Sequence, residues 1–298
     1  MIGCFFYACI SIAAVLVRNE EYLKSQLITY LGNKRKLLPL IEKAILSTDV
    51  KTGSFLDLFA GSGVVSRLAR LMGFQVTAND WEDFSCIISR AFLGLDRESL
   101  PGLLGSVKAL AELLEHINHL PEPEKDRQYM ALYYAPASRD IALANYKKER
   151  LFYTRDNALR IDKIRNYIED YYPAGRSARD DKIRSLLIAL LLVEASRHTN
   201  TSGVFKAYHK GFGGFGRDAL KRILAPIELP FPVLPDKALP ARIFFWGSAR
   251  RRYVSDFCFL DREASSSTWP GWQPRVLPGP RNSLSRLMPL RAKCQVPP

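Results

Sequence analysis

The chain of 298 residues and 33.8 kDa carries 43 Lys and Arg against 30 Asp and Glu, a formal net charge of +13. Its composition, 47% hydrophobic and 24% charged, excludes a disordered or collagen-like chain and is sufficient for a sizeable core. The basic surplus indicates a polyanionic partner, either nucleic acid or an anionic membrane face, although many soluble proteins are equally basic.

The N-terminal segment and the cysteines bear on cellular location. Residues 2–17 are almost wholly apolar, but 16 residues are too few to span a bilayer. A signal peptide begins with a positively charged segment, and no Lys or Arg precedes Arg18. We interpret residues 1–21 as an apolar extension or as upstream sequence translated from a misassigned start, with a signal peptide or anchor as the alternative. Five scattered cysteines without a C-x-x-C pair favour reduced thiols in a cytoplasmic protein without a metal site.

The first half of the chain alternates between helix and strand patterns. Apolar spacing predicts a helix over 36–46, with Pro39 in its first turn. A short buried strand over 54–60 leads through Gly61-Ser62-Gly63 into a helix from Val64 to about Met72. A second strand over 74–79 and a helix over 82–93 follow. This order is typical of the start of a parallel α/β sheet.

The second half is predicted to be mainly helical. We expect helices over 103–120, over 155–170 with Thr154 as N-cap, and over 182–197, separated by a loop over 173–181. The apolar run LLIALLLV predicts that the last helix is buried in the core. Five prolines predict that residues 226–240 form an extended connector.

The end of the chain differs in composition. Residues 241–298 hold 10 Lys and Arg against 3 Asp and Glu, a net +7, whereas residues 1–240 hold 33 against 27, a net +6. Residues 264–298 contain no acidic residue. More than half of the positive charge therefore lies in the last fifth of the chain, and charge is only weak support for a nucleic-acid partner.

Three short motifs carry chemistry. The sequence DLFAGSG (57–63) places a glycine turn between a strand and a helix, where backbone can approach a ligand closely. Asn79-Asp80 ends the second strand, where a carboxylate can accept hydrogen bonds from ribose hydroxyls. The basic segment YLGNKRK (30–36), which precedes a helix, suits a carboxylate or a phosphate.

Taken in order, Y-x-G-x-K, D-x-F-x-G-x-G and N-D resemble the Dam-like adenine-N6 DNA methyltransferases, including those of restriction–modification systems, over about residues 22–243. The resemblance implies an α/β fold: the Rossmann-like sheet of S-adenosylmethionine-dependent methyltransferases with a helical DNA-recognition insertion. It divides the chain into a cofactor-binding half (22–119), the insertion (120–225), a Pro-rich connector (226–245) and an aberrant basic tail (246–298).

The resemblance also implies the site residues. Asp80 would hold the ribose of S-adenosylmethionine and Lys34 would lie near its carboxylate, while Asn33 replaces a glycine that many members have. The complete set of implied cofactor contacts is Tyr30, Gly32, Lys34, Asp57, Phe59, Gly61, Gly63 and Asp80. The implied DNA contacts are Arg197, Asn200, Lys206 and Lys210.

The family's catalytic motif is missing. A D-P-P-Y motif supplies hydrogen-bond acceptors to the amino group of a flipped adenine and a tyrosine that stacks on the base. No D-P-P-Y, N-P-P-Y or S-P-P-Y occurs in this sequence, and Asp261 is the nearest candidate for its acidic residue. Upstream of Asp261, where family members usually have a Gly-Asp-Ala-like turn, Ser248 stands in place of the acidic residue. We infer that the tail is out of register with its ancestral reading frame, which leaves the C-terminal part of the sheet incomplete. A divergent but functional C-terminus is the alternative.

The leading hypothesis is a site-specific methyltransferase that transfers a methyl group from S-adenosylmethionine to the exocyclic amino group of adenine in DNA, inactive because D-P-P-Y is absent. A non-catalytic DNA-binding remnant of such an enzyme is the alternative, and an RNA or small-molecule methyltransferase is a third hypothesis. The expected partners are double-stranded DNA and a cognate restriction endonuclease, with no metal and no membrane.

Overall fold

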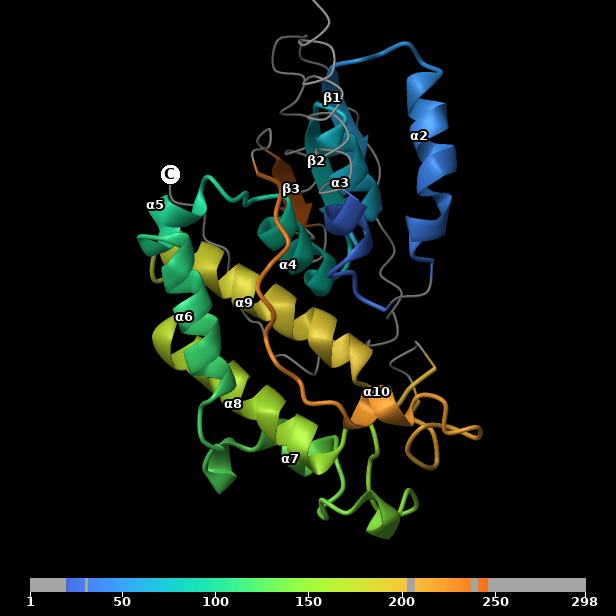
Figure 1. Cartoon of the computed structure of the whole chain (residues 1–298), viewed down its shortest axis with the longest axis vertical. Coiled ribbons are helices and arrows are strands. Elements are labelled where there is room, and N and C mark those ends of the chain that lie inside the picture. The colour runs from blue at the N-terminus through green and yellow to red at the C-terminus, as the bar shows by residue number, and fades with distance from the viewer. Residues whose placement is uncertain (1–19, 30–31, 203–206, 237–240, 246–298) are drawn as a thin grey trace, which may run out of the picture.

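The computed structural model of the chain describes residues 20–29, 32–202, 207–236 and 241–245 (Figure 1). Most of the apolar N-terminal extension and the whole of the basic tail, with Ser248 and Asp261, lie outside the described residues.

A parallel sheet occupies one end of the molecule, as the strand pattern predicts (Figure 1). Its strands are β1 (Gly53–Asp57), β2 (Phe74–Asp80) and β3 (Arg242–Phe245), in the spatial order β1-β2-β3. β1 is shorter than predicted, because the chain turns away from the sheet after Asp57. β3 is an addition to the prediction, since it forms at the end of the Pro-rich connector.

Helices cover the sheet in the predicted order. The short 3₁₀ helix η1 (Lys34–Leu37) leads into α2 (Leu38–Leu46), which has Pro39 in its first turn. α3 (Val64–Leu71) packs on β1 and β2 and also contacts α2, whereas α4 (Asp83–Phe92) contacts β2, β3 and α9. α4 therefore joins the sheet to the helical half of the molecule.

The helical half begins with α5 (Leu100–Leu104) and α6 (Val107–Asn118), which replace the single helix predicted over 103–120. Gly105 separates them with a left-handed φ of +87°, and the Ser106 hydroxyl caps α6 by accepting a hydrogen bond from the Ala109 N–H (3.0 Å). The remaining elements are η2 (Lys125–Arg127), α7 (Tyr129–Tyr133), η3 (Ile141–Leu143), α8 (Arg155–Tyr171), α9 (Ala178–Arg197) and α10 (Leu220–Leu224).

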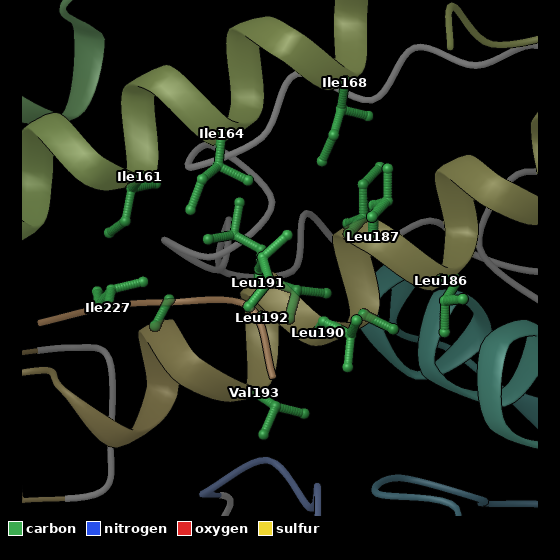
Figure 2. Packing of buried hydrophobic residues seen from close by; sticks show 14 of the residues in the cluster. Ile161, Ile164, Ile168, Leu186, Leu187, Leu190, Leu191, Leu192, Val193 and Ile227 are labelled. Atoms are coloured by element: carbon green, nitrogen blue, oxygen red, sulfur yellow. The ribbon is translucent and has the colours of Figure 1, made fainter. Parts of the chain in front are cut away.

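α9 is the central core helix, as its apolar run predicts. Figure 2 shows Ile161, Ile164 and Ile168 of α8 facing the leucines of α9. Because α4 packs against another side of α9, apolar residues all around this helix are buried. No helix in the described part of the chain is both long and apolar enough to cross a membrane.

The start of α9 differs from the prediction. The helix begins at Ala178, inside the segment 173–181 that was predicted as a loop. The Ser177 hydroxyl accepts a hydrogen bond from the Asp180 N–H (3.0 Å), and Asp180 and Asp181 lie in the first turn, where acidic side chains favour a helix. The predicted N-cap of α8 is confirmed, since the Thr154 hydroxyl accepts from the Asn157 N–H (3.3 Å).

The connector over 226–236 is extended, as its prolines predict, and buried or half-buried side-chain amides hold it in place. The amides of Gln26, Asn118 and Asn157 each accept a hydrogen bond from a connector N–H and donate to carbonyls of the connector or of the residues just before it. These bonds satisfy backbone groups of a segment that has no strand partner, so they fix the course of the chain over residues 227–233. The connector N–H groups concerned belong to Ile227, Leu229 and Val233.

Candidate functional site

The predicted glycine turn lies between the carboxyl end of β1 and the N-terminus of α3. Gly61 and Gly63 have left-handed φ angles of +53° and +74°, which a residue with a side chain adopts only with strain. The Gly63 N–H donates to the Ala60 carbonyl (2.7 Å) and Gly63 is the N-cap of α3. The turn therefore presents backbone N–H groups and the positive end of a helix at the edge of the sheet.

Asp80, at the end of β2, braces this turn directly. Its Oδ2 atom accepts a hydrogen bond from the Gly61 N–H (2.7 Å), and its Oδ1 atom accepts one from the Glu82 N–H (2.9 Å). A carboxylate has about four acceptor positions, so two remain for a ligand. Asn79 reinforces the contact, because its carbonyl accepts from the Ala60 N–H (3.0 Å) and its amide donates to the Leu58 carbonyl (2.9 Å).

The basic segment lies beside the same turn. The Lys34 ammonium donates to the Phe59 carbonyl (3.3 Å), which brings the first predicted motif to the second. Asn33 caps η1 by accepting from the Arg35 N–H (2.9 Å), while Gly32 has a φ of +86°. Tyr30 lies outside the described residues. The structure thus brings together a carboxylate, an ammonium group and a glycine turn from three separate motifs.

Two exposed aromatic side chains flank this arrangement. Phe59 in the turn is 73% exposed, and Trp81, next to Asp80, is 60% exposed. Sequence reasoning missed Trp81, although an aromatic residue directly after the acid at the end of a strand is a usable signal. The edge can therefore bind a molecule that combines an aromatic ring, hydroxyl groups and a charged group. No group of His, Cys, Asp and Glu side chains suited to a metal ion occurs among the described residues.

The positions of the site elements depend on two contacts made by α3. The Ser66 hydroxyl donates to the Asp57 carboxylate (2.6 Å), so Asp57 fixes the end of β1 to α3. The buried guanidinium of Arg67 donates to the carbonyls of Tyr22, Ser25 and Gln26 (2.9–3.1 Å). Burial lowers the pKa of Arg67 to about 10. Arg67 therefore anchors the segment that leads into Gly32 and Lys34, a role that no local pattern indicates.

The predicted DNA contacts have different environments. Arg197 at the end of α9 is partly exposed and pairs with Glu194 (2.9 Å), and Lys210 is exposed with its ammonium 5.6 Å from the centre of the Tyr146 ring. Lys206 lies outside the described residues. Asn200 does not fit the prediction, as it is 0% exposed.

The Asn200 side chain has a structural role instead. Its amide donates to the carbonyls of Leu151 (2.9 Å), His209 (3.2 Å) and Gly211 (3.4 Å) and accepts from the Gly213 N–H (3.1 Å). Both hydrogens of this buried amide have carbonyl partners, so no donor is left for a base or a phosphate. The burial of Asn200 counts against a direct DNA contact, which stays a prediction.

Comparison with known proteins identifies the family. The sequence pattern of the D12 class N6 adenine-specific DNA methyltransferases matches residues 30–227. Modification methylase LlaI of Lactococcus lactis subsp. lactis is 31% identical over 201 residues, which are 67% of this chain and 30% of that protein. Type II methyltransferase M.CviAII of Paramecium bursaria Chlorella virus 1 is 32% identical over 203 residues, 67% of this chain and 54% of that protein.

A third relative, type II methyltransferase M.NlaIII of Neisseria lactamica, is 29% identical over 205 residues, 67% of this chain and 52% of that protein. The chain spans about a third to about half the length of these curated relatives. No solved structure matches it. Because the family pattern covers well over half of the sequence, including the glycine turn, Asp80 and the helical half, the chain belongs to the D12 class of N6 adenine-specific DNA methyltransferases.

Proposed function

We propose that the chain binds S-adenosylmethionine at the carboxyl edge of β1 and β2 and duplex DNA through its helical half, and that it does not complete methyl transfer to adenine. The observation that carries the cofactor proposal is the convergence of three motifs through the Lys34–Phe59 and Asp80–Gly61 hydrogen bonds. The absence of D-P-P-Y from the sequence supports the lack of turnover.

The residues at this edge fit the cofactor. The two open acceptor positions of Asp80 suit the ribose hydroxyls, and the Lys34 ammonium suits the methionine carboxylate. The exposed rings of Trp81 and Phe59 suit the adenine and the apolar part of methionine. Bound S-adenosylmethionine would supply an electrophilic methyl group on its sulfonium, while Asp57, through Ser66, holds the end of β1 in place.

The sequence lacks the motif that would bind the adenine amino group. The lone pair of an adenine amino group is delocalised into the purine ring, so transfer needs acceptors that bind the amino hydrogens. In the sequence, Asp261 is followed by Arg262-Glu263 rather than by prolines and a tyrosine. The sheet that the described residues form is also incomplete on one side of β1. In sheets with strand order 3-2-1-4, a later strand pairs with the free edge of the first strand. Within the described residues, β1 has β2 as its sole neighbour.

Two measurements on the purified chain test the proposal. Calorimetry is expected to show binding of S-adenosylmethionine, and incubation with methyl-labelled S-adenosylmethionine and unmethylated genomic DNA is expected to give no incorporation. Robust incorporation would overturn the proposed inactivity and favour a divergent functional C-terminus. Binding of DNA without binding of the cofactor would instead favour a non-catalytic DNA-binding remnant.

The relatives suggest the biological setting. They are named modification methylases and type II methyltransferases. We propose a cytoplasmic protein encoded beside a restriction endonuclease that acts on the same site. Translation of the gene after codon 243 in the other two frames tests the origin of the tail: a D-P-P-Y in another frame would identify a frameshift, and its absence from both would count against one.

A further inference from the structure

The loop before α10 contains two phenylalanines with opposite environments. Its sequence over 211–216 is GFGGFG, and we refer to residues 211–217 as the glycine loop. Phe212 is buried in a small cluster with Leu151 and Ile223. Phe215, three residues later, has an exposed fraction of 110%, larger than in an extended reference peptide. A single exposed apolar side chain is common on protein surfaces, so the position of Phe215 on an ordered loop and the charges near it decide whether it has a role.

The base of the glycine loop is fixed, so the exposure of Phe215 follows from an ordered turn. The buried Asn200 amide binds Gly211 and Gly213, and Phe212 packs into the core beneath them. Gly213 and Gly214 have left-handed φ angles of +91° and +74°, and a Cβ atom on Gly213 would lie 3.1 Å from the Cα of Arg217. The loop therefore reverses tightly and presents Phe215 at its tip.

Positive charge is concentrated on the segments next to the glycine loop. Residues 145–150 adjoin the glycine loop, since the Tyr208 hydroxyl donates to the Glu149 carbonyl (3.2 Å) and Lys210 lies over Tyr146. Residues 145–150 and 207–222 together contain seven Lys and Arg but only two acids, Glu149 and Asp218. We call these seven exposed cations the basic rim: Lys147, Lys148, Arg150, Lys210, Arg217, Lys221 and Arg222.

The basic rim is connected to the cofactor edge. Asn200 follows the C-terminal end of α9, and the Ser196 hydroxyl in the last turn of that helix accepts a hydrogen bond from the Thr29 N–H (3.1 Å). Thr29 lies shortly before Gly32 and Lys34. The last turn of α9 therefore contacts the segment that leads to the glycine turn, and Asn200, just after this helix, holds the glycine loop.

We propose that Phe215 inserts between base pairs of duplex DNA while the basic rim binds the flanking phosphates. Apolar wedges, commonly phenylalanine, are a known means of unstacking a base step, and enzymes that act on a base must extrude it from the stack. Cations around the wedge match the regular negative charge of the duplex backbone. The inference rests on the proposed function, because it takes duplex DNA as the substrate.

Fluorescence anisotropy with a labelled duplex tests the wedge. The Phe215→Ala variant is expected to bind about 10-fold more weakly, since base–aromatic stacking contributes about 1–3 kcal/mol per base. A duplex with one abasic site should bind the wild type more tightly than a fully paired duplex, because less unstacking is needed, and the variant should lose this preference. The salt dependence should be unchanged in Phe215→Ala, whereas Lys147→Ala with Lys148→Ala should lower its slope by about 2.

Matched variants keep these outcomes interpretable. Leu40→Ala removes an exposed apolar side chain from α2, away from the glycine loop, and should bind DNA as the wild type does. Unchanged DNA binding by Phe215→Ala would overturn the wedge, as would a wild type that binds phosphatidylserine vesicles and no duplex. Binding of S-adenosylmethionine should be equal in wild type and Phe215→Ala. Failure of the wild type to bind this cofactor would refute the proposed function and leave a Phe215-dependent DNA contact standing.

Discussion

The Asp80 carboxylate and the Gly61 N–H form a 2.7 Å hydrogen bond between the ends of two neighbouring parallel strands. The bond holds the glycine turn in a left-handed conformation and leaves part of the carboxylate open. One side chain thus shapes the backbone of the site and retains acceptor capacity for a ligand. The two motifs are parts of one structural unit, although 19 residues separate them in the chain.

Asp80→Asn is expected to weaken binding of S-adenosylmethionine by about 10-fold or more, because hydrogen bonds to a charged acceptor contribute about 1.5–3 kcal/mol each. Calorimetry at neutral pH measures this loss. Glu112→Gln, on the exposed surface of α6, removes one negative charge elsewhere and should bind the cofactor as the wild type does. Equal affinity of Asp80→Asn and wild type would show that the carboxylate only braces the turn.

The sequence was sufficient to predict that these motifs lie close together, but not whether an individual side chain is buried or exposed. Carboxyl ends of parallel strands share one edge, so the spacing from Gly61 to Asp80 is sufficient to place them together. Phe212 and Phe215 occur in the same local pattern, and only packing against Leu151 and Ile223 distinguishes the buried ring from the exposed one.

Other differences have similar physical causes. Asn200 resembles a surface amide in sequence, and its burial depends on carbonyls that come from separate segments of the chain. The early start of α9 follows from the Ser177 cap, which outweighs the loop-like composition of PAGRSARDD. β3 pairs with β2 shortly after a connector that side-chain amides hold in place, and a proline-rich pattern reveals neither contact.

Asn200→Ala is expected to lower the free energy of unfolding by about 2–4 kcal/mol, since several buried backbone groups lose their partner at once. Urea unfolding followed by circular dichroism measures the change. Arg197→Ala, three residues earlier and partly exposed, should stay within about 0.5 kcal/mol of the wild type. A stable Asn200→Ala protein that binds DNA poorly would contradict the structural role and restore the predicted DNA contact.

Asn118→Ala is expected to loosen the connector. The Asn118 amide accepts from the Leu229 N–H (2.7 Å) and donates to the Leu229 carbonyl (3.1 Å), the only contacts of this kind that α6 makes with the connector among the described residues. Hydrogen exchange at the Leu229 amide should become about 10-fold faster or more, because each unsatisfied buried group costs about 1–3 kcal/mol.

The same experiment has an internal reference. Amides in the middle of α9, which lie in the core away from the connector contact, should keep their protection in Asn118→Ala. An equal loss of protection at both places would indicate global destabilisation, and unchanged exchange at Leu229 would show that the prolines alone fix the connector.

Asp162 should give the protein a distinct pH dependence. This α8 carboxylate is buried and accepts hydrogen bonds from the Met130 N–H (2.7 Å) and the Ala131 N–H (2.9 Å) at the start of α7. Burial raises the pKa of Asp162 to about 6, and these hydrogen bonds and the charge of Arg155 offset only part of that increase. The folded state therefore binds more protons than the unfolded state between about pH 4 and pH 6.

Because the excess protons are on the folded side, the contribution of Asp162 to stability falls as the pH rises through this window. Relative to Asp162→Asn, which does not titrate, the wild type should lose roughly 2–3 kcal/mol of unfolding free energy between pH 4 and pH 7. Urea unfolding of both proteins at a series of pH values measures the difference and cancels the titration of all other groups. Asp170→Asn, which removes an exposed carboxylate paired with Arg127, should not reproduce this trend. A wild-type advantage that grows with pH would mean that the hydrogen bonds to α7 outweigh burial and hold Asp162 ionised.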